Sequence, residues 1–197
     1  MDNMETRIRK QFKTRIRNQM DNMETRIRNQ PVMMTKDDPS HFSFIWKVED
    51  FSQQLQNAKQ EDRDIDLFSE PFYTHKNGYH LKLELDPNGH SNVSVYLIVV
   101  RGEYDAILTW PFDWDIKFIL LDQRPDNSRR KNIENVMTPD RTNSGHLDSF
   151  KRPTTDENDG LGFPTFVSHK TLAKENYVVD GTLFLQLELH NYVKAWF

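Results

Sequence analysis

Histidine and acidic side chains are the first candidates for chemistry in this sequence, because metal ions and general acid-base steps depend on them. No two histidines stand at the HxH, HxxxH or HExxH spacing that places two imidazoles on one face of a strand or helix. We therefore expect no bound metal ion. The seven histidines are His41, His75, His80, His90, His146, His169 and His190.

Three short stretches resemble parts of a catalytic or ligand site, but each lacks an essential partner. Ser168 and His169 are neighbours on a predicted strand, so their side chains point to opposite faces and cannot form a nucleophile and base pair. Asp113 and Asp115 are better explained as exposed acids at the start of a strand. Residues 156–160 lack the alternating acids and the distal glutamate of a calcium loop, and no glycine-rich phosphate loop is present. We predict no cofactor and no enzymatic activity.

Composition and charge divide the chain into two unlike parts. Residues 1–30 contain eight Lys/Arg and four Asp/Glu, whereas the remainder contains 18 and 26, so the first part is basic and the second acidic. Cysteine is absent, which excludes disulfides and thiolate zinc sites and fits a reducing compartment. No apolar run is long enough to span a membrane, and no secretory signal is recognisable, so we expect a cytoplasmic protein without membrane insertion.

The basic part carries a tandem repeat with helical spacing. The segment MDNMETRIR of residues 1–9 recurs as residues 20–28, and the apolar residues follow one another at intervals of three and four. This pattern predicts a helical coiled-coil stalk over residues 1–30, and the mean spacing of 3.8 residues favours a straight or right-handed supercoil. Nucleic-acid binding by the arginines is less favoured because acids are interleaved with them. The expected oligomerisation residues are Met4, Ile8, Phe12, Ile16, Met20, Met23 and Ile27.

After a linker over residues 31–40, the remaining chain to residue 197 has the pattern of short strands. Residues 79–85 alternate strictly, which predicts Tyr79, Leu81, Leu83 and Leu85 on the inner face. Several other runs are rich in apolar or β-branched residues and are bounded by turns, which favours a mainly β, antiparallel sandwich. The other expected strands are 42–47, 72–75, 93–100, 116–121, 133–137, 163–168 and 183–189, with short helices at 51–60 and 170–175.

The strand-rich part resembles the MATH domain, specifically the TRAF type found in tumour necrosis factor receptor-associated factors. Ordered segments carry the resemblance across residues 42–189: FIWKVEDF (44–51), FSEPFYTHKNGYHLKLEL (68–85), TWPF (109–112), LLDQ (120–123), FKRP (150–153), GFPTFVSH (162–169) and YVVDGTLFL (177–185). The resemblance implies an eight-stranded antiparallel sandwich that follows a trimeric stalk. It also implies binding of short, extended peptides from receptor tails or other signalling proteins.

The same resemblance implies a peptide groove. Family members usually carry a basic residue, a tyrosine and an acid where this sequence has Glu84, Asp86 and His90, and a serine where it has Leu161. A solvated face also explains the first three residues, and plain core packing also explains Tyr96 and Phe150. The implied groove residues are Glu84, Asp86, His90, Tyr96, Ser149, Phe150, Leu161, Gly162, Phe163 and Pro164.

These observations favour a signalling adaptor that docks peptides and self-associates as a homotrimer. The substituted groove predicts that its peptides are less acidic than the usual ligands of the family and carry Lys or Arg more often. Two alternatives stay open: a substrate-recruiting MATH module of a ubiquitination complex, and a carbohydrate-binding or hydrolytic β-sandwich. No binding of nucleic acid is expected.

Overall fold

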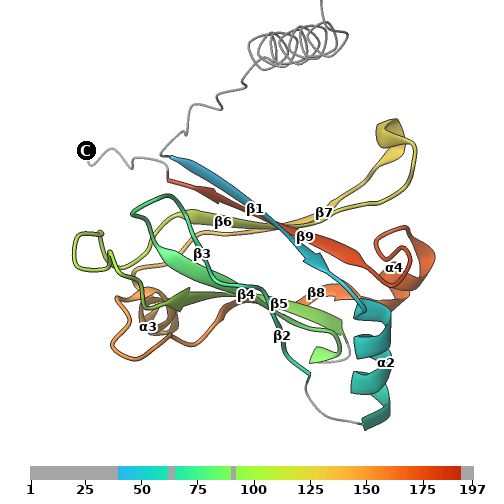
Figure 1. Ribbon diagram of the computed structural model, residues 1–197, viewed down its shortest axis with the longest axis horizontal. Coiled ribbons are helices and arrows are strands. Elements are labelled where there is room, and N and C mark those ends of the chain that lie inside the picture. The colour runs from blue at the N-terminus through green and yellow to red at the C-terminus, as the bar shows by residue number, and fades with distance from the viewer. Residues whose placement is uncertain (1–39, 62–64, 90–91, 192–197) are drawn as a thin grey trace, which may run out of the picture. The chain divides into compact units, whose positions relative to one another are not determined.

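The computed structural model describes residues 40–61, 65–89 and 92–191 (Figure 1). The predicted stalk over residues 1–30 and the groove residue His90 lie outside the described residues. The elements in chain order are β1 (His41–Val48), α2 (Phe51–Glu61), β2 (Leu67–Phe68), β3 (Phe72–Tyr73), β4 (His80–Asp86), β5 (Asn92–Val100), β6 (Asp115–Leu120), the 3-10 helix η2 (Asn127–Arg129), β7 (Ile133–Met137), α3 (Ser144–Phe150), β8 (Leu161–Ser168), α4 (His169–Lys174) and β9 (Leu183–His190).

The strands form two antiparallel sheets that pack face to face (Figure 1). One sheet has four strands in the order β1-β9-β6-β7, and the other has β2-β4-β5-β8 with β3 also paired to β4. The predicted antiparallel sandwich is therefore confirmed. The described residues form nine strands where eight were expected, because Leu67–Phe68 adds a short edge strand that was not predicted.

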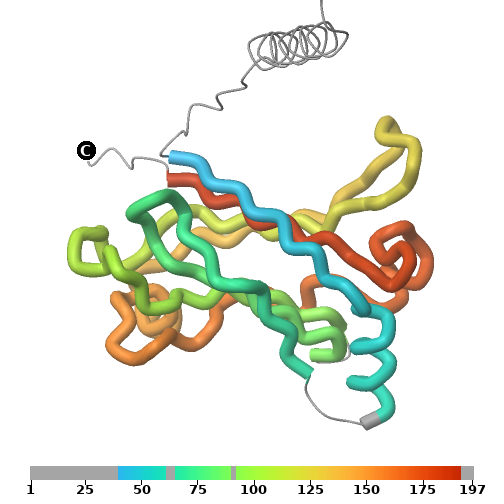
Figure 2. The backbone as a smooth tube through the Cα atoms, viewed as in Figure 1, coloured from blue at the N-terminus to red at the C-terminus, as the bar shows by residue number. Residues whose placement is uncertain are grey.

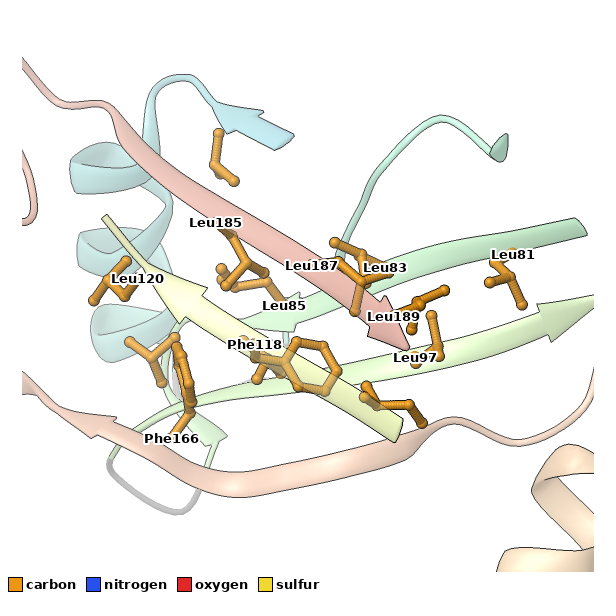
Figure 3. Packing of buried hydrophobic residues seen from close by; sticks show 14 of the residues in the cluster. Leu81, Leu83, Leu85, Leu97, Phe118, Leu120, Phe166, Leu185, Leu187 and Leu189 are labelled. Carbon is orange, nitrogen blue, oxygen red and sulfur yellow. The ribbon is translucent and has the colours of Figure 1, made fainter. Parts of the chain in front are cut away.

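The core lies between the two sheets and follows the alternation of the sequence. Leu81, Leu83 and Leu85 of β4 are almost completely buried, as predicted, and so is Tyr79 before them. Figure 3 shows these leucines of β4 opposite the leucines of β9 and beside Phe118 of β6. Burial of each such side chain contributes about 1.5 to 3 kcal/mol, so this layer supplies much of the driving force for folding.

The central strand β5 is apolar on both faces because its outer side is covered as well. Residues 156–160 continue β8 along the end of β5, with hydrogen bonds from the Arg101 amide to the Asp156 carbonyl (2.8 Å) and from the Asn158 amide to the Val99 carbonyl (3.0 Å). A Cβ at Gly160 would lie 3.1 Å from Ile98, whose outward side chain is buried. The chain thus screens one end of the outer face from solvent.

The helices are short and lie in the connections between strands. The predicted helices at 51–60 and 170–175 correspond to α2 and α4, within one residue at each end. Helix α3 was not predicted, since its signal is only an Asn143 side chain that accepts hydrogen bonds from the next turn of backbone. Within the part of the chain described above, no helix is both long and apolar enough to cross a membrane.

Candidate functional site

The outward side chains of β4 form a charged surface beside the central strand β5. Lys82, Glu84 and Asp86 alternate with the buried leucines, and their register partners on β5 are Ile98, Tyr96 and Ser94. The predicted outward placement of Glu84 and Asp86 is therefore correct. Tyr96 is only partly buried and lies on the same outer side. We call this surface the acidic face; its charged members are Asp66, Lys82, Glu84, Asp86 and Glu157.

Lys82 is the cation of this surface, and its charge is already paired. Its ammonium lies 2.7 Å from Oε2 of Glu157, and its side chain is only 15% exposed. The same ammonium lies 4.4 Å from the centre of the Phe68 ring on β2, which is 49% exposed. The contact with the ring and the ion pair together hold Lys82 against the sheet, so its cation is not open to an approaching carboxylate.

Glu84 stands among like charges. Burial raises the pKa of the Glu84 carboxyl, and the neighbouring Asp66, Asp86 and Glu157 raise it further. Lys82 acts in the opposite direction, but a single paired cation does not cancel the four carboxylates. The face therefore attracts positive charge and repels negative charge.

Asp86 has a structural role as well as a charge. Its Oδ1 accepts a hydrogen bond from the Asn88 amide at 2.8 Å, which closes the turn after β4. The turn is held from outside by Nε2 of His169, which lies 2.8 Å from the Pro87 carbonyl oxygen. Substitution of Asp86 would disturb the turn, so Glu84 is the cleaner probe of the acidic face.

Strand β8 borders the face on its other side and is an edge strand within the described sheet. Gly162 is the register partner of Tyr96, and a Cβ at this position would lie 2.0 Å from the Val95 carbonyl oxygen, so only glycine fits. The Pro164 carbonyl accepts a hydrogen bond from Oγ of Ser94 at 2.8 Å, and the ring of Pro164 is exposed. Proline at this position suits an edge strand because it has no amide proton to donate.

Four of the implied groove residues are buried or pack in part against the core. The register of β8 places Leu161 and Phe163 on the core side, and the Phe163 ring packs edge-on against Phe118 at 5.9 Å. Phe150 is 1% exposed, and Ser149 is also buried, with its carbonyl oxygen 3.0 Å from Nδ2 of Asn158. For Phe150 the alternative of plain core packing is the correct one. The structure brings together Glu84, Asp86, Tyr96, Gly162 and Pro164.

Sequence reasoning did not connect Glu157 and Phe68 with this surface. Glu157 belongs to the stretch 156–160, which was considered only as a calcium loop, and the antiparallel bridge between Val100 and Glu157 brings it to Lys82. Phe68 lies in a two-residue strand that is too short to give a periodic signal. Both contacts depend on long-range pairing, so no local pattern would have revealed them.

The residues considered for catalysis have other partners. Oγ of Ser168 accepts a hydrogen bond from the Thr171 amide at the start of α4, while the His169 ring turns toward Pro87, so the two side chains are not paired. Asp113 forms an ion pair with Arg141. Over the same described ranges, no three histidine or acidic side chains are grouped so as to hold a metal ion.

Comparison with known proteins agrees with the fold. The sequence profile of the TRAF/meprin MATH domain matches residues 64–186, and the chain therefore belongs to this family. It is 39% identical to human TNF receptor-associated factor 5 over 150 residues and 36% identical to human TNF receptor-associated factor 1 over 151 residues. Each alignment covers 73% of this chain, but only 25% and 34% of those relatives, so the chain spans a quarter to a third of their length.

A solved structure shows the same fold. The TRAF5 structure from Notothenia coriiceps superposes with a TM-score of 0.69, covering 95% of this chain and 93% of that one, at 24% sequence identity. The superposition supports the fold, and the family match and the curated relatives identify the chain as a TRAF-like MATH domain.

Proposed function

We propose that this chain is a signalling adaptor that binds short, extended peptide segments from receptor tails or signalling proteins on its acidic face. The observation that carries the proposal is that Tyr96 of β5 is paired with Gly162 of the edge strand β8 on one side and with Glu84 of β4 on the other. An extended peptide at this edge would use main-chain hydrogen bonds for affinity and the adjoining side chains for specificity. The relatives are named as TNF receptor-associated factors, which fits a receptor-derived ligand.

The charge of the face selects among such peptides. Four carboxylates surround one lysine whose charge is already neutralised by Glu157, so a peptide carboxylate would be repelled, whereas a lysine or arginine side chain would be attracted. Exposed charge pairs contribute only about 0.2 to 1 kcal/mol each. The preference therefore takes the form of a salt-sensitive association rate, while Tyr96 and the peptide backbone supply most of the affinity.

Avidity would come from self-association through residues 1–30, whose apolar stripe has the spacing of a helical stalk. Three linked domains would hold a clustered receptor more tightly than one domain. In this role the chain acts by binding in the cytoplasm and performs no catalysis of its own.

The experiment is a selection from a random peptide library with the full chain, at low and at physiological salt. The wild type should enrich peptides that contain Lys or Arg, and Glu84→Lys should weaken the binding of those peptides about two- to fivefold at low salt. Glu49→Lys makes the same charge change on an exposed residue after β1 in the other sheet and should leave the enrichment unchanged. If the wild type and Glu84→Lys enrich the same peptides with the same affinity, the ligand does not bind at this face.

A further inference from the structure

Two histidines that are far apart in the sequence meet at the end of the four-stranded sheet. His41 is the first residue of β1, His190 is the last residue of β9, and the two are directly paired in the register of these strands. Figure 2 shows the blue and red ends of the described chain running side by side. The two Nδ1 atoms lie 3.2 Å apart, and the ring centroids lie 4.6 Å apart.

The surroundings of the pair are acidic. Oε2 of Glu188 lies 3.8 Å from the second ring nitrogen of His190, Nε2. Asp115 is the register partner of His190 on the opposite side, in β6, and its Oδ1 is buried without a hydrogen-bond partner. The nearby cation is Lys117, whose ammonium lies 3.6 Å from Glu188 and 2.8 Å from Glu134. Carboxylates therefore flank His190 in two directions, and the lysine charge is shared with Glu134.

We propose that His41 and His190 bind a divalent transition-metal ion, with zinc as the representative, through their two Nδ1 atoms. Two nitrogens bound to one tetrahedral zinc at about 2.0 to 2.1 Å are separated by about 3.3 Å, which is close to the distance present here. Imidazole nitrogen suits Zn²⁺, Cu²⁺ and Ni²⁺, whereas Ca²⁺ and Mg²⁺ require oxygen ligands. Solvent completes the coordination, in keeping with the lack of a third grouped ligand in the described chain.

The second nitrogen of His190 supports this assignment. A histidine that binds a metal usually donates its other ring N–H to a carboxylate, which sets the tautomer and makes the ligand nitrogen more basic. Glu188 lies on the correct side of the ring for this role. When both rings are neutral, the Nδ1–H that one ring donates to the other has to move to Nε2 of the same ring before both Nδ1 atoms can bind the metal, and solvent can carry that proton.

The ion would join the first and last strands of the sandwich. The ladder of β1 and β9 extends one step past the histidines, where the Asn191 amide donates to the Ser40 carbonyl at 2.8 Å. The end of a ladder opens more readily than its centre, and a ligand that binds only the closed form shifts that equilibrium. Zinc should therefore protect the backbone amides at this end of β1 and β9 from hydrogen exchange.

In the experiment, ZnCl2 is titrated into the untagged full chain. Binding is measured by calorimetry and by the midpoint temperature of thermal unfolding. We expect one ion per chain and a higher midpoint with zinc. His41→Asn and His190→Asn should each weaken binding by about tenfold or more, while Glu188→Gln should weaken it less. His75→Asn removes an exposed histidine from the turn between β3 and β4 and should bind zinc as the wild type does.

Nitrogen NMR of the histidine rings in the wild-type chain gives a test that requires no variant. Zinc should shift the Nδ1 resonances of His41 and His190 together and leave those of His75 in place. The inference is overturned if these two resonances do not move, if both asparagine variants bind zinc as tightly as the wild type, or if one ion is bound per two chains.

Discussion

The ammonium of Lys82 lies 2.7 Å from the Glu157 carboxylate, so the one lysine of the acidic face is neutralised by a residue 75 positions further along the chain. Because Lys82 is paired with Glu157, its positive charge only partly offsets the groups that raise the pKa of Glu84. Lys82→Met should therefore raise the pKa of Glu84 further, because it removes the group that lowers it and keeps the apolar stem. Carboxyl NMR during a pH titration measures the change. Lys47→Met, which removes a paired lysine from β1, should leave the pKa of Glu84 unchanged.

Leu83→Ala should lower the free energy of unfolding by about 2 to 5 kcal/mol, since the side chain is completely buried at the centre of β4 and its loss leaves a cavity. Lys82→Ala, at the preceding position, should cost about 1 kcal/mol or less because its ion pair is partly exposed. Urea unfolding of both variants gives the comparison. Equal losses would contradict the inward and outward assignment of the whole strand.

Asp122→Ala should destabilise the protein by about 3 kcal/mol. The buried Asp122 carboxylate accepts hydrogen bonds from the Lys131 and Arg124 amides (2.9 and 3.0 Å) and lies 2.6 Å from Nε of Arg124. Burial alone would raise the pKa of Asp122, but these interactions outweigh it and hold the pKa below its usual value. Asp126→Ala removes an exposed carboxylate from the same loop and should cost less than about 1 kcal/mol.

The destabilisation by Asp122→Ala should depend on pH, because the pKa of Asp122 is lowered in the folded protein. A carboxyl with a lowered pKa in the folded state stabilises the protein fully above its unfolded value of 3.8, and this stabilisation is lost as the pH falls through the folded pKa. The difference in unfolding free energy between the wild type and Asp122→Ala should thus be constant from pH 7 to about 5 and shrink below about 4. A difference that persists undiminished in acid would contradict the role of the ionised carboxylate.

Tyr79→Phe should cost about 1 kcal/mol, because the buried hydroxyl donates a hydrogen bond to the Thr109 carbonyl. Burial, and next the charge of Asp113, raise the pKa of Tyr79 to about 12. Because the pKa of Tyr79 is raised in the folded state, the stabilisation by its neutral hydroxyl is complete below the unfolded pKa of 10.0. This stabilisation is lost as the pH rises toward 12. An ultraviolet titration of the folded protein should show a phenol that ionises near pH 12, and this step should be missing in Tyr79→Phe.

The full chain should be oligomeric, and a trimer is expected from its resemblance to the TRAF type. A helix over residues 1–30 would be about 45 Å long and would have to bury its stripe of Met, Ile and Phe. Sedimentation equilibrium at tens of micromolar measures the mass with and without residues 1–30. A monomer in both cases would contradict the stalk.

The sequence alone determined the sandwich and the faces of its strands. Alternation in residues 79–85 and 183–189 is a local property of extended backbone, and burial of one face requires it, so the inward leucines were predictable. The outward orientation of the Glu84 side chain follows from the same alternation. The two-residue strand β2 and helix α3 escaped prediction because neither is long enough to show a period.

Only the tertiary structure decided which outward residues meet. The pairing of Lys82 with Glu157 and of His41 with His190 depends on strand order and register, which join residues 75 and 149 positions apart. The spacing of the histidines along the sequence had predicted no histidine cluster. A spacing rule covers residues of the same strand or helix, and it contains no information on residues of the neighbouring strand. The register of β8 likewise turned Leu161 and Phe163 toward the core and left Gly162 beside Tyr96. Long-range hydrogen bonding between strands is the physical reason, since it places side chains beside one another without leaving a pattern in either segment.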